Sequence, residues 1–272
     1  MFTKLILNDP AMAEGSLFAG DEVQYNLLYR ISEGSDSLCL KTAEGSMIFA
    51  HTPGHKGWLW ISQELAAGKQ DDMFEKLAIE LKNVSLSGIT GAPDTVERFA
   101  EIYSKKKDIR LEKEMTMESY YCPKVLKPSN VRGEFREAAA EDVKTVAGYL
   151  SGFLRDAFNS SVEPESQLSK AETIIEAGGL YLWQVDGKPV SMANISHRSA
   201  KYGRINSVFT PIGLRKKGYA SALTAELCTI LEKERLIPML YADISNPASN
   251  KVYQNIGFVK SGMITEIKFL DK

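Results

Sequence analysis

The second half of the chain shows a regular alternation of apolar and polar positions that predicts strands and helices in turn. Residues 180–185 and 189–196 have strand-like patterns and are joined by Asp186-Gly187, a dipeptide typical of a tight hairpin. The spacing of apolar residues predicts further strands at 135–138, 204–210, 238–244 and 263–270, and helices at 141–158, 165–177, 218–235 and 247–256.

The first half has weaker periodicity. Residues 17–31 carry apolar side chains at loose helical spacing, and residues 38–50 read as a hairpin through Glu44-Gly45. An apolar run, Trp58 to Ile61, follows a segment rich in turn-forming residues. Beyond it, the pattern predicts helices at 71–83 and 93–105 and strands at 84–89 and 110–121.

The two halves are separated by a segment that suits neither a helix nor a central strand. Pro123, Pro128 and Asn130 interrupt it. A chain of 272 residues is long for one ordinary core and suits two. We therefore predict an α+β domain at 1–128 and a second α+β domain with a mixed sheet at 129–272.

Composition narrows the classes of function. The chain is 44% hydrophobic and 25% charged with a formal charge of -2, which gives no electrostatic reason to expect binding to nucleic acid or to a membrane surface. Cys39, Cys122 and Cys228 are odd in number and have no metal-ligand spacing, which argues against a disulfide framework and a zinc site. No apolar segment approaches the roughly 20 residues of a membrane span. We expect a cytoplasmic protein with no metal.

Candidate chemistry is concentrated in two segments of the second half. In the first, the strand ending at Thr210 is followed by a Pro-Gly turn and a helix that opens with Gly218. Free backbone N–H groups at a helix start bind anions, and Arg215, Lys216 and Lys217 add positive charge to the same loop. The pattern predicts a phosphate cradle, although a basic turn before an ordinary buried helix would have a similar sequence.

In the second segment, Asn246 is a favourable N-cap and Pro247 suits the first position of a helix. Asn250 and Tyr253 are three residues apart and share a face of that helix. An Asn amide can both donate to and accept from an amide-bearing ligand, and a Tyr hydroxyl can protonate a departing thiolate. The alternative for Tyr253 is a core aromatic residue.

Together, these segments resemble the GNAT superfamily of N-acetyltransferases. Arg215-Lys-Lys-Gly-Tyr-Ala220 fits the family's Arg/Gln-x-x-Gly-x-Gly/Ala loop for acyl-coenzyme A. The segment from Asn246 to Tyr253, with Ile256-Gly-Phe258, fits its following strand-helix motif. The resemblance covers residues 132–272 and implies a splayed sheet with acetyl-CoA wedged between strands 204–210 and 238–244.

The resemblance also implies residue roles. Tyr253 would be the general acid that protonates the coenzyme A thiolate while an amine attacks the thioester directly. The acetyl-CoA site would comprise main-chain or side-chain groups of Val208, Phe209, Thr210, Arg215, Lys216, Lys217, Gly218, Tyr219, Ala220, Ser221, Asn246 and Asn250.

The acceptor and the general base cannot be assigned from this pattern. The expected acceptor is a primary amine of a small molecule or peptide. Many family members carry a carboxylate where this chain has Asn206 and Ser207, so a non-catalytic acyl-CoA-binding or regulatory protein is the alternative. A homodimer is also an open alternative.

The order of elements in the first half loosely echoes the second, which suggests a degenerate GNAT-like repeat. The segment Ser87 to Pro93, before a helix, occupies the place of the strand-helix motif. No Arg-x-x-Gly-x-Gly/Ala string occurs there. We therefore expect a single acetyl-CoA site, in the second half.

Overall fold

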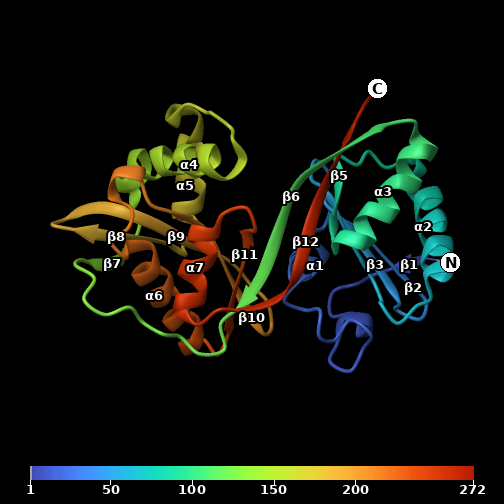
Figure 1. The fold of residues 1–272 in the computed structure, drawn as a ribbon, viewed down its shortest axis with the longest axis horizontal. Helices are drawn as coiled ribbons and strands as arrows, with labels where there is room; N and C mark the ends of the chain where they lie inside the picture. Colours follow the sequence, from blue (N-terminus) through green and yellow to red (C-terminus); the bar gives the residue numbers. More distant parts are fainter. Residues whose placement is uncertain (1) are drawn as a thin grey trace. The chain divides into compact units, whose positions relative to one another are not determined.

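The computed structural model describes residues 2–272, and its packing divides the chain into two compact units (Figure 1). The first unit consists of Met1–Ser119 with Ser261–Lys272, and the second of Tyr120–Lys260. The boundary expected at residue 128 stays a prediction about domains. In the structure, residues 120–128 pack with the second unit and the last twelve residues, Ser261–Lys272, pack with the first.

Strands of the first unit lie in the order β1-β2-β3-β4-β5-β12-β6. All neighbouring pairs from β1 to β12 are antiparallel except β4 and β5, which are parallel. Their bounds are Phe2–Lys4 (β1), Leu38–Thr42 (β2), Met47–His51 (β3), Gly57–Ile61 (β4), Gly88–Gly91 (β5), Arg110–Tyr121 (β6) and Val259–Leu270 (β12).

Helices α2 (Ala67–Glu80) and α3 (Pro93–Lys107) cover one face of these strands through a core that includes Leu59, Phe74 and Phe99. Aromatic residues near the N-terminus contact side chains of the other face, where Tyr25 lies beside Trp58 and Phe18 beside Trp60. The helix predicted at 17–31 is confirmed only for α1, Leu27–Ser32, and the preceding residues form turns. The strand expected at 84–89 is β5, which begins at Gly88.

The second unit contains strands in the order β11-β10-β9-β8-β7. Only the pair β10 and β11 is parallel, and the others are antiparallel. Asp186 and Gly187 both have positive φ, as the predicted hairpin between β8 and β9 requires. The bounds are Glu134–Glu137 (β7), Leu180–Val185 (β8), Lys188–Arg198 (β9), Tyr202–Phe209 (β10) and Ile237–Asp243 (β11).

Helices cover both faces of these strands, as Figure 1 shows. One face packs on α6 (Tyr219–Lys233) and α7 (Pro247–Ile256), through a core that includes Ile205, Leu223 and Ile256. The other face packs on α4 (Val143–Phe158) and α5 (Leu168–Glu176), through Leu150, Met192 and neighbouring apolar residues. This arrangement is an α+β fold with a mixed sheet, as predicted, and it leaves the parallel pair β10 and β11 between the two helical layers.

Candidate active site

The parallel strands β10 and β11 pair over only part of their length. Cα partners run from Tyr202 opposite Ile237 to Arg204 opposite Met239, and no later residue of β10 has a partner on β11 among residues 2–272. The following residues of β10, 205–209, therefore have a backbone edge that β11 does not occupy. Such an edge offers N–H and C=O groups to an amide-bearing arm. The resemblance to the family implied a splay of this kind between strands 204–210 and 238–244.

A bulge in β10 changes the direction of the side chains along this edge. Ser207 has φ 50, and Ser207 and Val208 together face the single residue Ala193 between the pairs Asn206–Asn194 and Phe209–Met192. After the bulge, Val208 packs with the α6 core while Phe209 packs with the α4 core. Ser191 fixes the end of the strand, because its hydroxyl donates to the carbonyl of Phe209 at 2.9 Å.

The loop after β10 ends in a helix start with no side-chain cap. A short 3-10 turn, Ile212–Leu214, leads to Arg215, and Gly218 at the N-cap has φ 83, a conformation that suits glycine. The first N–H groups of α6, at Tyr219, Ala220 and Ser221, therefore have no acceptor within the helix. Lys216 and Lys217 are exposed in the same loop. The structure thus brings the predicted cradle residues together.

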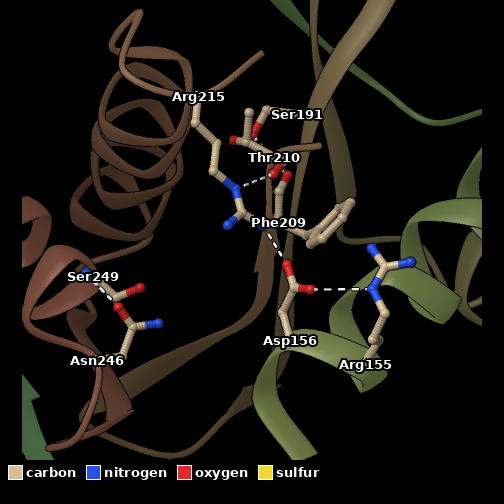
Figure 2. A network of polar contacts seen from close by, with 8 residues as sticks. All are labelled: Arg155, Asp156, Ser191, Phe209, Thr210, Arg215, Asn246 and Ser249. Carbon is tan, nitrogen blue, oxygen red and sulfur yellow. Dashed lines mark hydrogen bonds and ion pairs between the residues drawn. The ribbon is translucent and has the colours of Figure 1, made fainter. Parts of the chain in front are cut away.

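The side chain of Arg215 lies back against the strand and helix α4 (Figure 2). Its Nε donates to the carbonyl oxygen of Thr210 at 2.8 Å, and its guanidinium forms an ion pair with Asp156 of α4. The guanidinium carbon is 5.9 Å from the centre of the Phe209 ring. These contacts tie the cradle loop to the strand edge, and the sequence offered no local signal for Asp156.

Helix α7 begins as predicted, with Asn246 as its cap. The Asn246 side chain accepts from the backbone N–H of Ser249 at 3.0 Å, as Figure 2 shows. The amide of Asn250 donates to the carbonyl oxygens of Asp243 at 2.7 Å and of Asn246 at 2.8 Å. Its Oδ1 accepts from the hydroxyl of Tyr120 at 2.8 Å. Both N–H groups of Asn250 are therefore engaged, and one lone pair of Oδ1 remains.

Tyr253 is buried in the core between α6, α7 and β11, where its ring lies near those of Tyr120 and Phe258. Burial, and secondarily the neighbouring Tyr120, raise the pKa of the Tyr253 hydroxyl well above its usual range. Within residues 2–272 this hydroxyl has no hydrogen-bond partner. Tyr253 is therefore a protonated donor at neutral pH, although it is also the core aromatic residue that the sequence left as an alternative.

Comparison of the sequence with models of known protein families finds a match. Residues 149–258 match the model of the acetyltransferase (GNAT) family, a range that contains β10, the cradle loop, β11 and α7. The match covers less than half of the chain, so it assigns residues 149–258, and not the whole chain, to this family. No curated protein matches the sequence.

Solved structures with the same fold match over almost the whole chain. A GCN5-related N-acetyltransferase from Sphaerobacter thermophilus is 13% identical with a TM-score of 0.63, covering 100% of this chain and 96% of that one. An acetyltransferase from the GNAT family of Colwellia psychrerythraea is 11% identical with a TM-score of 0.59, covering 100% of both chains. A GCN5-related N-acetyltransferase from Kribbella flavida is 13% identical with a TM-score of 0.60, covering 94% and 96%. At these identities the likeness concerns the fold.

The second unit also has an open cleft of about 630 Å³ on the α4 side of β10. Its walls are α4, the loop that follows α4, and the end of β10, where Phe209 and Pro211 lie. Lys144, Arg155 and Glu163 give it both signs of charge. The sequence did not predict this cleft, because its walls come from segments that are about 50 residues apart.

Residues 2–272 contain neither a cluster of metal ligands nor a membrane-spanning helix. No cluster of three or more His, Cys, Asp or Glu side chains suited to a metal ion occurs in the part of the chain that the structure describes. None of the helices described within residues 2–272 is long and apolar enough to cross a membrane. His197 lies within β9 and is buried.

Proposed function

We propose that this protein is an N-acetyltransferase that moves an acetyl group from acetyl-CoA to a primary amine of a small molecule or peptide. The proposal rests on two features that follow one another along the chain. The unpaired edge of β10 ends at Phe209, and nine residues later Gly218 opens helix α6 without a side-chain cap. A donor with a pyrophosphate and an amide-bearing arm matches both features at once.

The cradle suits a pyrophosphate for reasons of space and charge. A Cβ on Gly218 would lie 3.0 Å from Val131, and the positive φ of Gly218 disfavours any side chain. The N–H groups of Tyr219, Ala220 and Ser221 and the partial positive charge of the helix start would contact the phosphates. Lys216 and Lys217 would add attraction that is sensitive to salt.

The arm of the donor would lie along Val208, Phe209 and Thr210, with its amides hydrogen-bonded to the strand edge. Asn250 would meet it through the remaining lone pair of Oδ1, and Asn246 would hold the start of α7 in place. Arg215 would either keep its contacts with Thr210 and Asp156 or exchange them for a phosphate.

The reaction would be a direct transfer. The amine nitrogen attacks the thioester carbon, the C–S bond breaks, and Tyr253 gives its proton to the departing thiolate. The Tyr253 hydroxyl is protonated in the neutral range, as this role requires, and burial, which raises its pKa, makes it a weaker acid until the thiolate forms beside it. Cys228 is fully buried in the α6 core and supplies no nucleophile for a covalent intermediate.

The second candidate is a non-catalytic acyl-CoA-binding or regulatory protein, favoured by the amide of Asn206 where many family members carry a carboxylate. A cytoplasmic location is part of the proposal and is supported by three free, buried cysteines, which are typical of a reducing compartment.

Two measurements separate these candidates. Calorimetry should show acetyl-CoA binding, and a screen of primary amines should reveal one that accelerates release of coenzyme A thiol. Tyr253→Phe should then lower kcat while leaving the acetyl-CoA Kd within a factor of two or so, because it removes a proton and little binding surface. Binding without amine-dependent thiol release would favour the regulatory protein, and equal losses in kcat and affinity would remove the general-acid role.

A further inference from the structure

Asn206 lies between the part of β10 that pairs with β11 and the bulge in β10. It follows Arg204, the last residue of β10 with a Cα partner on β11, by two residues, and it immediately precedes the bulge at Ser207. A donor arm that runs from the cradle back along the strand edge towards the closed end of the splay would bring its thioester to this point. Asn206 is half-buried, so its side chain is accessible there.

The direction of the Asn206 side chain follows from its neighbours. Ile205 and Val208 pack with the α6 core, and Phe209 packs with the α4 core. Because side chains alternate along a strand and the bulge adds one residue, Asn206 lies on the α4 face. Asn194, its partner on β9, lies on the same face between residues of the α4 core.

The amide oxygen of Asn206 faces Asn194. Nδ2 of Asn194 donates to Oδ1 of Asn206 at 3.1 Å. Since the oxygen of Asn206 is turned towards Asn194, its amide nitrogen is turned away from Asn194, and Nδ2 has no acceptor among residues 2–272. Asn206 therefore presents N–H groups to the site, where a carboxylate would present oxygens.

Asn194 has no evident reason to be polar other than this contact. It is 7% exposed, and its Oδ1 is buried without a hydrogen-bond partner. That oxygen lies 3.6 Å from the position that a Cβ on Gly179 would take, and Gly179 has φ 89. A buried oxygen that lacks a partner is unfavourable, so a residue that keeps one while orienting a neighbour points to a role beyond packing.

We propose that the side-chain N–H of Asn206 donates a hydrogen bond to the carbonyl oxygen of the thioester, and that Asn194 is the positioning residue that keeps this donor aimed. The proposal rests on the proposed function. An N–H repels an ammonium acceptor but suits an oxygen that gains negative charge, which is the thioester oxygen during attack.

Atoms and electrons balance in this step. The lone pair of the amine forms the C–N bond, and the carbonyl π electrons move to the oxygen that faces Asn206. As that pair returns, the C–S bond breaks and the thiolate takes a proton from Tyr253. The attacking nitrogen loses one proton to solvent or to Tyr253, so the products are an amide and coenzyme A thiol.

The test measures the hydrogen bond to the thioester oxygen directly and needs no amine substrate. Acetyl-CoA with ¹³C at the thioester carbonyl is bound to the wild-type protein, to Asn206→Asp and to Asn206→Ala, and the carbonyl stretch is recorded by infrared difference spectroscopy. A hydrogen bond to the oxygen weakens the C=O bond, so the wild-type stretch should lie at lower frequency than in either variant. Asn206→Asp is the matched variant, because it keeps the shape and removes the N–H.

Asn194→Asp tests the positioning role. A carboxylate at residue 194 cannot donate to Oδ1 of Asn206, so the Asn206 amide should turn its N–H groups towards residue 194 and its oxygen towards the site. The stretch should then move to the frequency of Asn206→Asp, with a melting temperature and an acetyl-CoA Kd that show the fold intact. A purely structural Asn194 would change stability and leave the stretch at its wild-type frequency.

With water as the acceptor, or with an amine from the screen, Asn206→Asp should release coenzyme A about 10²-fold more slowly, the loss typical of one oxyanion donor. A wild-type stretch equal to that of both Asn206 variants, with acetyl-CoA bound, overturns the inference and leaves the proposed function standing. Absence of acetyl-CoA binding to the wild-type protein overturns the proposed function itself. If Asn194→Asp does not fold, the two Asn206 variants decide the matter alone.

Discussion

Two helices in this chain follow the first strand of a parallel pair, and their starts differ in the features that bind an anion. Helix α6 of the second unit starts at a glycine with φ 83, after a loop with Arg215, Lys216 and Lys217. Helix α2 of the first unit starts after Ala66, in extended backbone, and its loop carries Glu64. The start of α2 therefore lacks both the N-cap glycine and the basic loop of the phosphate site proposed at α6.

The parallel strands themselves also differ. In the second unit, β10 has no Cα partner on β11 after Arg204, and in the first unit β4 has none on β5 after Trp58, but the backbones of β4 and β5 still approach each other beyond that point. A Cβ on Gly91, the last residue of β5, would lie 2.3 Å from the carbonyl oxygen of Leu59, so the two backbones touch there. Leu59 and Gly91 therefore leave no room for an arm between them. That it is a degenerate repeat stays a prediction, which the shared strand order supports.

The largest expected effect concerns the cradle. Gly218→Glu places a side chain and a negative charge where the phosphates would lie, and we expect the acetyl-CoA Kd to rise at least about 100-fold, or 2.7 kcal/mol. Gly68→Glu in the first turn of α2 is the matched control, because a Cβ there meets no heavy atom within 4 Å. Calorimetry of both variants measures the contrast. An unchanged Kd in Gly218→Glu would contradict the site assignment.

The second prediction concerns α4, the helix that packs against Phe209 at the end of β10. A Cβ on Gly152 of α4 would lie 2.4 Å from the buried ring of Phe209, whereas one on Gly148, a turn earlier, meets nothing within 4 Å. We expect Gly152→Ala to lower the free energy of unfolding by about 1–3 kcal/mol through overpacking. Gly148→Ala should raise it by up to about 1 kcal/mol, because alanine favours helix. Denaturant unfolding of the pair tests this, and equal effects would contradict the α4–β10 contact.

The third prediction concerns how the helices begin. Neither α2 nor α4 has a side-chain cap hydrogen bond, but Asp142 before α4 accepts from Arg136 at 2.6 and 2.8 Å and from the N–H of Ala139 at 2.9 Å, whereas Ala66 before α2 has no such group. Asp142→Asn should lower the free energy of unfolding by about 1–2 kcal/mol at pH 7.

The pH dependence of this difference has a defined sign. The hydrogen bond from Arg136 keeps the pKa of Asp142 below its usual value despite burial, so its stabilisation is present above the unfolded value of about 3.9 and is lost as pH falls through the folded value. Urea melts of wild type and Asp142→Asn at pH 7 and pH 3 should therefore converge on acidification. A constant gap between them would contradict the ion-pair account.

The smallest effect is expected in the first unit. The hydroxyl of Tyr25 accepts from the N–H of Ala92, which precedes α3, at 2.8 Å. Tyr25→Phe should cost about 1 kcal/mol of stability, the worth of one hydrogen bond, and should leave the acetyl-CoA Kd unchanged. A change in the Kd would show that the first unit takes part in donor binding.

The sequence predicted the elements whose signals are local. Helix α7 begins and ends at residues 247 and 256 as expected, because Asn246 and Pro247 determine its start and Gly257, with φ 108, its end. The hairpin at Asp186-Gly187 and the helix after Gly218 were predicted for similar reasons. The positions of the loop before α6 and of the segment from Asn246 to Tyr253 could therefore be predicted from the sequence alone.

Features that depend on distant partners could not be predicted in this way. The apolar residues of 17–31 suggested a helix, but Phe18 and Tyr25 owe their spacing to contacts with Trp60 and Trp58. Ser207 adopts φ 50 without a glycine or asparagine to signal it, because the bulge depends on pairing with β9. The contact of Arg215 with Asp156 and the orientation of Asn206 by Asn194 likewise depend on tertiary structure.

The central claim is that the donor site belongs to the second unit alone. Isothermal titration of the whole wild-type chain with acetyl-CoA tests it most directly through the stoichiometry of binding. The account predicts one acetyl-CoA per chain, with that binding lost in Gly218→Glu and kept in Gly68→Glu. Two molecules per chain, or one that Gly68→Glu removes, would contradict it.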